Sequence, residues 1–369
     1  MSATIIPLND LRPSDDEEAA LQAAVSSVVA RGRYIAGPQV EAFESEFAAY
    51  CGVEHCIGVA SGTDALVLSL RALDLPPGSE VATIATAGGY TSIAIERNGL
   101  VPRYVDCRND GLMSARHLEQ LMASHQLGAV VVTHLYGNAS GATDIVQACA
   151  TRGIPIVEDC AQAHGARVGD RRAGNLGSVG CFSFYPTKNL GALGDAGAVV
   201  TADANIANRL RQLRNYGWRS QRYVSDLAGG INSRLDELQA AVLRIRLQSL
   251  DQRNERRRSI ARRYLDAASD LTAALGRQPG PHDVFHLFVL RCQNRPKALK
   301  HFEAKSIATD IHYPVPDYRQ PRFKRGQSEP TTLSNTEAHC GQILTIPCYP
   351  SMSDADVDRV CSALVQGWN

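Results

Sequence analysis

A lysine stands between a short apolar segment and a glycine-rich turn in the stretch GCFSFYPTKNLGALGDAGAVVT (180–201). A lone lysine in a loop is usually solvated, but Lys188 is flanked by Ser183 and by glycines, which permit close approach of the backbone to a ligand. A lysine amine condenses with an aldehyde to form a Schiff base, and burial lowers its pKa for that work. The stretch therefore predicts a nucleophilic amine in a cleft.

A carboxylate ends the apolar run of PIVEDCAQAHGA (155–166). Burying Asp159 is costly unless the carboxylate is paired, and one use of such a group is to keep a pyridinium nitrogen protonated. The alternative, of equal weight, is that Asp159 caps the N-terminus of a helix, where aspartate is favoured. His164, five residues later, is interpreted as a structural residue.

A phosphate site is indicated by VASGTDALVLSL (59–70), which has the pattern of a strand, a turn and a helix. The amides of Gly62 and Thr63 would point out of the helix N-terminus, where anions bind. The same Ser-Gly-Thr turn also makes an ordinary helix cap. Taken together, however, an anion site, a buried carboxylate and a lysine are the three groups that pyridoxal 5′-phosphate (PLP) requires.

The elements that must position these groups alternate between strand-like and helix-like segments from about residue 56 to 203. This alternation predicts a mostly parallel sheet that is covered by helices on both faces. In such sheets, ligands bind beyond the carboxyl ends of the strands, so the residues that follow each strand are candidates for chemistry. The expected strands are CIGVA (56–60), EVATIAT (80–86), GAVVVTH (128–134), IPIVED (154–159), CFSFY (181–185) and GAVVTA (197–202).

A long helix is expected from about residue 234 to Leu265, because apolar residues recur at helical spacing over its first part. These residues are Leu235, Leu238, Val242 and Ile245. The run of Arg256, Arg257 and Arg258 is interpreted as a solvated helix face and not as a nucleic-acid site.

The remainder of the chain predicts a smaller α+β unit. FHLFVLRC (285–292) has the pattern of a strand, and Ser353 is a candidate N-cap for a final helix. We therefore expect a large PLP-binding domain over residues 1–244, which includes an N-terminal substrate loop, and a small C-terminal domain over residues 245–369.

Composition excludes several functional classes. Apolar residues make up 44% and charged residues 21%, which is ordinary for a globular protein, and the formal net charge of zero argues against nucleic acid or a membrane as the main partner. No segment predicts a signal peptide or a membrane span. The ten cysteines lack metal-ligand spacing, so we expect no metal site and reduced, mostly buried thiols in a cytoplasmic protein.

The sequence resembles the DegT/DnrJ/StrS-type sugar aminotransferases, which belong to the aspartate aminotransferase superfamily (PLP fold type I). The similarity runs almost end to end and keeps the order of the family's segments. It covers RGRYIAGPQVEAFESEFAAYCGV (31–53), ASGTDAL (60–66), VEDCAQAHGA (157–166), SFYPTKNLGALGDAG (183–197), GINSRLDELQAAVL (230–243), IHYPVP (311–316) and TIPCYPSMSDADV (345–357).

The resemblance implies a role for each matching residue. Lys188 is the Schiff-base lysine, Asp159 pairs with the pyridine nitrogen, and Gln162 lies near the ring hydroxyl. Four further residues bind the phosphate, the last of them from the neighbouring subunit of a homodimer: Gly62, Thr63, Ser183 and Asn232. The loops that line the sugar-nucleotide site contain Tyr34, Gly37, His312, Tyr313 and Pro314.

One segment departs from the family pattern. Many members carry a proline and an aromatic residue where IATAGGYTS (84–92) has Ile84 and Gly88, and that aromatic side chain stacks on the cofactor ring. Tyr90, two residues on, is the candidate replacement if Gly88 and Gly89 reshape the loop.

The implied activity is PLP-dependent transfer of an amino group, with glutamate as the donor, to a nucleotide-linked keto-sugar. NLGALGD directly after Lys188 and the IHYPVP loop resemble the subgroup that acts at carbon 3 of dTDP-linked 6-deoxyhexoses. The alternatives are an aminotransferase acting at carbon 4 and a non-catalytic PLP-binding sensor. A deoxygenating enzyme is disfavoured, because such relatives have histidine in place of the lysine and the chain has no iron–sulfur cysteine cluster.

Overall fold

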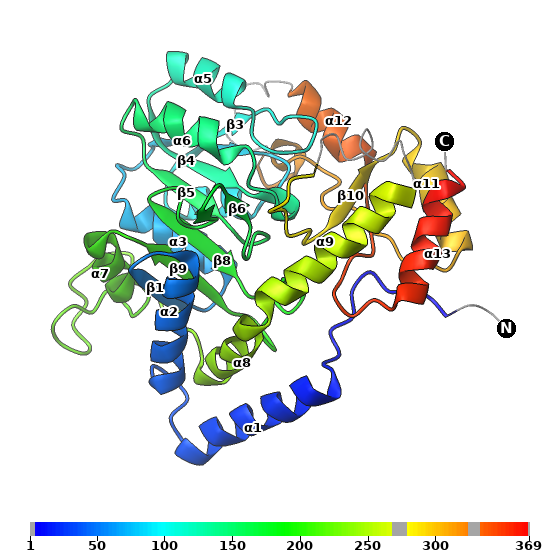
Figure 1. Ribbon diagram of the computed structural model, residues 1–369. Helices are drawn as coiled ribbons and strands as arrows, with labels where there is room; N and C mark the ends of the chain where they lie inside the picture. Colours follow the sequence, from blue (N-terminus) through cyan, green and yellow to red (C-terminus); the bar gives the residue numbers. More distant parts are fainter. Residues whose placement is uncertain (1–3, 268–278, 324–332, 368–369) are drawn as a thin grey trace.

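A seven-stranded sheet forms the centre of the computed structural model, which describes residues 4–267, 279–323 and 333–367 (Figure 1). Its strands lie in the order β1 (His55–Val59), β9 (Gly197–Thr201), β8 (Val179–Ser183), β5 (Ile156–Asp159), β4 (Leu127–Thr133), β2 (Glu80–Ile84) and β3 (Val101–Val105). Strand β9 is antiparallel to both of its neighbours, and the other pairs are parallel. The predicted mostly parallel sheet is therefore confirmed, and all six expected strands are present.

The sequence did not predict the edge strand β3, VPRYV. Its alternation of apolar and polar residues is weak, and it contains Pro102, which cannot donate a ladder hydrogen bond. Proline is tolerated at the edge of a sheet, which is where β3 lies.

Both faces of the sheet are covered by helices. Because successive strand residues point to opposite sides, the side chains of a single strand pack in two different cores. In β4, Val131 packs in the core beneath α3, whereas Val130 and Val132 pack in the core on the other face. Helices α3 (Gly62–Ala72), α4 (Tyr90–Arg97) and α7 (Ala204–Leu213) contribute to the first core. Helices α2 (Pro38–Cys51), α5 (Ala115–Ser124), α6 (Ala142–Ala150) and α8 (Glu237–Gln248) contribute to the cores of the second face.

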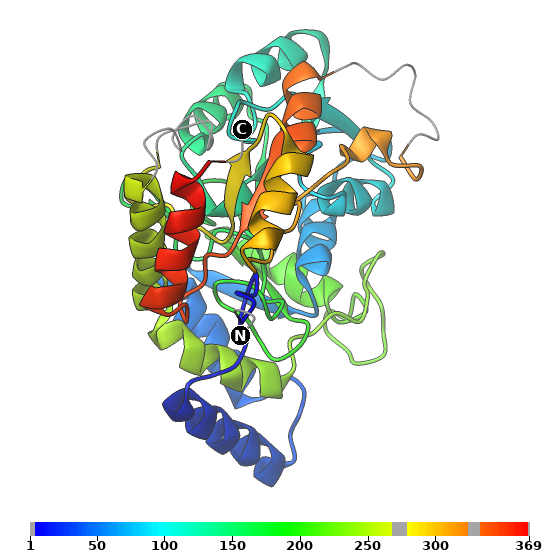
Figure 2. The same ribbon diagram turned by 90° about the vertical axis from the view of Figure 1, so that its right-hand side faces the viewer.

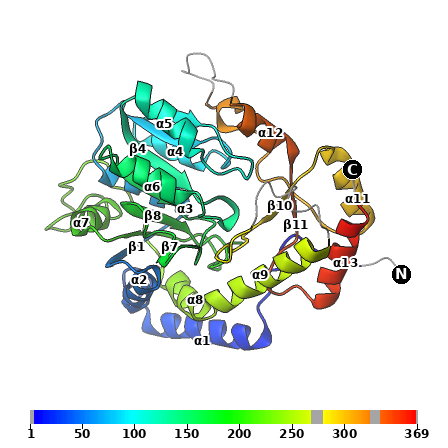
Figure 3. The same ribbon diagram turned by 45° about the horizontal axis from the view of Figure 1, so that its top comes forward.

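The helix expected to run from about residue 234 to Leu265 is in fact two helices, α8 and α9 (Leu250–Ala267). Ser249 separates them, since its φ of −104° and ψ of 2° lie outside the helical range. Helix α9 leads from the sheet to the second unit, while α1 (Asp15–Arg31) lies beside α8 (Figures 1 and 3). No helix among the described residues combines the length and the apolar character that crossing a membrane would need.

The second unit has its own core around a two-stranded antiparallel sheet, β10 (Phe288–Arg291) and β11 (Ile343–Ile346). Figure 2 shows helices α11 (Arg295–Ala304), α12 (Ser334–Gln342) and α13 (Asp354–Val365) around it. The strand expected within 285–292 is confirmed, and Ser353 caps α13 by accepting a hydrogen bond from the Asp356 amide. Ile6 packs in this core from the other end of the chain, so the division into residues 1–244 and 245–369 stays a proposal.

Short elements complete the described chain: β6 (Arg167–Val168), β7 (Arg171–Arg172), η1 (Leu135–Gly137) and η2 (Asp317–Arg319). All ten cysteines are thiols, and nine of them are buried, as the sequence predicts.

One buried carboxylate ties three strand ends together beneath the edge of the sheet. Glu158 Oε2 lies 2.8 Å from His134 Nε2, and its oxygens accept hydrogen bonds of 2.7–2.9 Å from the amides of Gly174, Leu176 and Gly177. Burial alone would raise the pKa of Glu158, but His134 and the backbone amides lower it below its usual value. The carboxylate is thus compensated as an anion.

We expect Glu158→Gln to lower the free energy of unfolding by roughly 3 to 5 kcal/mol, because it leaves buried donors without their charged acceptor. Urea denaturation at a fixed protein concentration measures the change. The matched control is Glu46→Gln, which breaks the exposed pair with Arg244 and should cost less than about 1 kcal/mol. Equal losses in the two variants would contradict the role assigned to Glu158.

Candidate active site

Strands β1, β5 and β8 bring their carboxyl ends to the same edge of the sheet. Asp159 is the last residue of β5, Ser183 is the last residue of β8, and Gly62 begins α3 just after β1. A Cβ added at Gly62 would lie 2.5 Å from the Cβ of Ser183, so a larger residue does not fit there. The N-terminus of α3, with Gly62 and Thr63 in its first turn, therefore lies against Ser183, as a phosphate site requires.

Asp159 is buried at this edge, with 6% of its surface exposed. Its Oδ1 accepts a hydrogen bond of 3.1 Å from the Ala161 amide, and its Oδ2 lies 3.4 Å from the Thr91 hydroxyl. Within the described chain, residues 160–166 form turns and no helix begins there, so the capping alternative finds no helix to cap. Burial raises the pKa of Asp159, and the Ala161 amide and the nearby Lys188 oppose this rise.

Lys188 lies in the turn after β8, where its amide donates a 2.8 Å hydrogen bond to the Tyr185 carbonyl. Burial lowers the pKa of its amine to about 8, and the charge of Asp159 opposes this effect. An amine with this pKa is largely unprotonated in mildly alkaline solution, and the unprotonated form is the nucleophile. Lys188 is half-buried and lines a pocket, and its role as a nucleophile stays a prediction.

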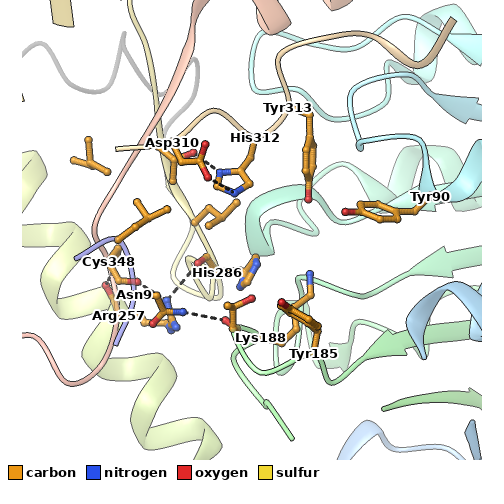
Figure 4. Close-up of a pocket in the computed structure, with 15 residues that line it drawn as sticks. Asn9, Tyr90, Tyr185, Lys188, Arg257, His286, Asp310, His312, Tyr313 and Cys348 are labelled. Atoms are coloured by element: carbon orange, nitrogen blue, oxygen red, sulfur yellow. Dashed lines mark hydrogen bonds and ion pairs between the residues drawn. The ribbon is translucent and has the colours of Figure 1, made fainter. Parts of the chain in front are cut away.

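A pocket of about 360 Å³ opens beside Lys188 (Figure 4). One wall comes from the large sheet and the opposite wall from the second unit. Of the residues expected at the site from sequence, four line it: Lys188, Tyr90, His312 and Tyr313. The lining residues that the sequence did not point to include Asn9, Tyr185, Arg257, His286, Asp310 and Thr345.

Gln162 links this edge of the sheet to the second unit. Its Oε1 accepts a 2.7 Å hydrogen bond from the Tyr136 amide, which turns its Nε2 toward the Tyr313 hydroxyl at 3.2 Å. The Tyr136 hydroxyl in turn donates to the His312 carbonyl at 2.5 Å. This chain of contacts fixes the orientation of Gln162 and the position of the loop that carries His312 and Tyr313.

Four of the expected residues lie elsewhere in the described structure. Tyr34, Gly37, Asn232 and Pro314 do not line this pocket; Gly37 is buried, and the other three are exposed. Tyr34, Gly37 and Asn232 belong to neighbouring segments, since Ile35 forms a β-bridge with Asp236. The roles expected of Tyr34, Gly37 and Asn232 at the site therefore stay predictions.

Glu237 holds the loop that contains Tyr34 and Gly37. Its buried carboxylate accepts hydrogen bonds of 2.8–3.0 Å from the amides of Gly37, Gln39 and Val40 at the N-terminus of α2. A Cβ at Gly37 would lie 2.7 Å from a Glu237 oxygen, which explains the glycine. No local pattern indicates this contact, because the two residues are 200 positions apart.

The interpretation of Arg256–Arg258 as a solvated face is wrong for Arg257, which is only 4% exposed and lines the pocket. Arg257 is in register with Ile260 and Tyr264 on the buried face of α9, and it donates to the carbonyls of residues 285, 286 and 348. Burial lowers its pKa to about 10, so it still carries its charge at neutral pH. The helical spacing was the signal that could have found it.

The loop of residues 310–323 docks on the turn that follows β2. The Asp317 amide donates to the Ala85 carbonyl at 2.9 Å, and its Oδ2 accepts a 2.6 Å hydrogen bond from the Ser92 hydroxyl. Burial raises the pKa of Asp317 to about 7, and the Ser92 hydrogen bond opposes this rise. The contact between the two units thus contains a carboxyl group that titrates near neutral pH.

Comparison with known proteins gives a family match over most of the chain. The model described as "DegT/DnrJ/EryC1/StrS aminotransferase family" matches residues 15–365. The chain is 41% identical, over 98% of its length and 96% of the relative, to dTDP-3-amino-3,4,6-trideoxy-alpha-D-glucose transaminase of Streptomyces venezuelae. It is 40% identical, over 98% and 99%, to dTDP-3-amino-3,6-dideoxy-alpha-D-galactopyranose transaminase of Aneurinibacillus thermoaerophilus.

Among solved structures, the fold is similar to that of S. venezuelae DesV in complex with a ketimine intermediate. The TM-score is 0.91 at 39% identity, and the match covers 99% of this chain and 98% of that chain. The expected PLP fold type I architecture is therefore confirmed.

The Asp317 geometry predicts a specific pH dependence of stability. Between about pH 4 and pH 7, the folded protein keeps a proton on Asp317 that the unfolded chain has released. The free energy of unfolding therefore falls as the pH rises through this range. Asp317→Asn removes this titration and can still accept the Ser92 hydrogen bond. The melting temperature of the variant minus that of the wild type should increase from pH 5 to pH 8.

The control for this prediction is Asp354→Asn, which removes an exposed carboxylate whose pKa is lowered by Arg256. Its difference from the wild type should stay constant between pH 5 and pH 8, because it titrates below that range. If the Asp317→Asn difference is equally constant, the assigned protonation of Asp317 is wrong.

Proposed function

The chain belongs to the DegT/DnrJ/EryC1/StrS aminotransferase family, and we propose that it transfers an amino group from glutamate to carbon 3 of a dTDP-linked 6-deoxy keto-sugar, with PLP as cofactor. The observation that carries the proposal is the proximity of Lys188 and Asp159. A half-buried lysine whose amine has a lowered pKa lines a pocket, and a buried carboxylate lies close enough to oppose that shift.

The residues at the sheet edge fit the cofactor. Asp159 is a buried carboxylate without a full ion-pair partner, and a protonated pyridine nitrogen would compensate its charge. The α3 N-terminus beside Ser183 would hold the phosphate, and Gln162 would lie near the ring hydroxyl. When bound, PLP supplies an electron-withdrawing ring that makes the hydrogen on the amino-bearing carbon acidic.

The chain's own residues then carry the proton. Lys188 would take the proton from the amino-bearing carbon of the donor and pass it to the cofactor, and in the second half-reaction it would move a proton from the cofactor to the sugar carbon that becomes aminated. A pKa of about 8 suits this double role, because such an amine both accepts and releases a proton near neutral pH. Asp159 would keep the ring nitrogen protonated throughout, and the surrounding buried side chains would exclude water that weakens these interactions.

The choice of carbon 3 is supported by the names of the two relatives described above, both of which are transaminases that form 3-amino sugars. These relatives differ at carbon 4 of the sugar, according to their names, so the substrate class is better supported than the individual sugar.

Glutamate is proposed as the donor by analogy with the family. A cytoplasmic location is proposed because ten thiols persist most readily in a reducing compartment.

We also propose a homodimer with shared active sites. Asn232 is exposed, and its backbone pairs with Asn215 beside a loop that presents Tyr216, Trp218 and Tyr223 to one another. Tyr223 is 73% exposed, and Tyr34 and Ile35 are exposed on the adjoining segment. Exposed apolar groups that gather in this way are typical of an interface. A partner chain here would bring Asn232, Tyr34 and Gly37 to a second subunit's site.

The experiment for the activity is competition between keto-sugars. With PLP and glutamate present, we expect the protein to aminate a dTDP-3-keto-6-deoxyhexose in preference to its 4-keto isomer, with products followed by mass spectrometry. Lys188→Ala is the control, because it removes the proton-carrying amine. A preference for the 4-keto isomer would move the assignment to carbon 4, and absence of turnover with cofactor bound would favour the sensor alternative.

The experiment for the shared site is complementation between inactive variants. Mixing Lys188→Ala and Asn232→Ala chains should restore activity, since one site of each mixed dimer then has both intact residues. Mixing Lys188→Ala with Asp159→Asn is the matched control and should restore nothing, because those two residues serve the same chain's site. If subunit exchange is verified and neither mixture recovers activity, the site is not shared through Asn232.

A further inference from the structure

The turn after β2 carries no side chain at Gly88 and Gly89, where it meets the second unit. Gly88 and Gly89 both adopt positive φ, 79° and 86°, a conformation that residues with a Cβ rarely adopt. A Cβ added at Gly88 would lie 3.0–3.2 Å from three carbons of the Tyr313 ring. The space that a side chain at residue 88 would occupy is therefore taken by an aromatic ring from the second unit.

Contacts on several sides fix the ring of Tyr313. Its hydroxyl accepts the hydrogen bond from Gln162, whose orientation is set by the Tyr136 amide. The Tyr90 ring meets it edge-on, with centroids 6.2 Å apart and an interplanar angle of 76°. Burial raises the pKa of the Tyr313 hydroxyl, so the group stays neutral at physiological pH. Tyr313 is thus a preorganised, uncharged aromatic surface.

Tyr90 is a poorer candidate for a contact with the cofactor. It is 49% exposed and begins α4, so much of its ring remains in solvent. Figure 4 shows Tyr313 extending from its loop toward Lys188, with Tyr90 beside it. Tyr313 also bonds to Gln162, which lies three residues after Asp159 at the cofactor edge.

We propose that the ring of Tyr313 contacts the face of the bound cofactor ring, and so supplies across the two units the aromatic side chain that residue 88 lacks. The inference rests on the proposed function, because it assumes that PLP binds at Lys188. Two aromatic rings in offset or edge contact attract each other beyond the burial of their area. Docking of the 310–323 loop through Asp317 and Ser92 holds Tyr313 in place for this contact.

The test measures cofactor binding and not turnover. Tyr313→Leu removes the aromatic ring, and Tyr313→Phe keeps the ring but removes the hydroxyl. We expect the leucine variant to raise the PLP dissociation constant about tenfold and to reduce the circular dichroism of the bound cofactor's absorption band. The phenylalanine variant should stay within about threefold of the wild type, because the ring contact is retained.

Two further variants make the test decisive. Tyr90→Leu should raise the dissociation constant less than Tyr313→Leu does, and an equal or larger rise would overturn the assignment. Tyr313→Met is a second non-aromatic variant in case the leucine chain does not fold, with folding checked by far-ultraviolet circular dichroism. If a folded non-aromatic variant binds PLP as tightly as the wild type, the inference is wrong.

The wild-type protein separates this inference from the proposed function. Borohydride reduction of the PLP-loaded chain, followed by peptide mapping, should place the label on Lys188. A wild-type chain that takes up no cofactor would overturn the proposed function and the inference together. A labelled Lys188 with unaltered binding in the folded Tyr313 variants would overturn the inference alone.

Discussion

The partial burial of one lysine and the nearly complete burial of one carboxylate beside it are the constraint on which the site depends. Burial disfavours the charged form of both groups, since it lowers the pKa of Lys188 and raises that of Asp159. Each group also favours the charge of the other. Their pKa values therefore move toward the range in which protons are exchanged near neutral pH, and the sheet must hold them together against the cost of desolvation.

Two neighbouring carboxylates of the sheet differ in how their buried charge is compensated. Glu158 and Asp159 are adjacent in β5, and successive strand residues point to opposite faces. Glu158 is compensated by His134 and three backbone amides, so it fixes the surrounding chain as a permanent anion. Asp159 has fewer hydrogen bonds and keeps capacity for a ligand. Two buried carboxylates in sequence thus serve structure and chemistry separately.

The parts that the sequence predicted are those encoded locally. Six strands, the position of Lys188 after β8 and that of Asp159 at the end of β5 follow from short apolar runs and the polar residues that end them. Arg257 was misread because a run of three arginines is usually solvated, although its spacing from Ile260 and Tyr264 places it on the buried face. The contact of Gly88 with Tyr313 and that of Glu237 with Gly37 join residues about 200 or more positions apart. Local pattern carries no information about such contacts.

The two walls of the pocket come from different parts of the chain. Tyr185 and Lys188 follow strand β8 of the sheet, whereas Asp310, His312, Tyr313 and Thr345 come from the second unit. A pocket of about 360 Å³ is at the small end of the range for ligand sites, so it is too small to hold the cofactor together with a whole nucleotide sugar. Under the proposed function, the donor and the sugar would occupy this pocket in turn, and the nucleotide would lie outside it. Recognition of the nucleotide would then fall to exposed segments such as the one around Tyr34, which Glu237 holds in place. Such a division allows the outer loops to change with the substrate while the amine and the carboxylate keep their geometry.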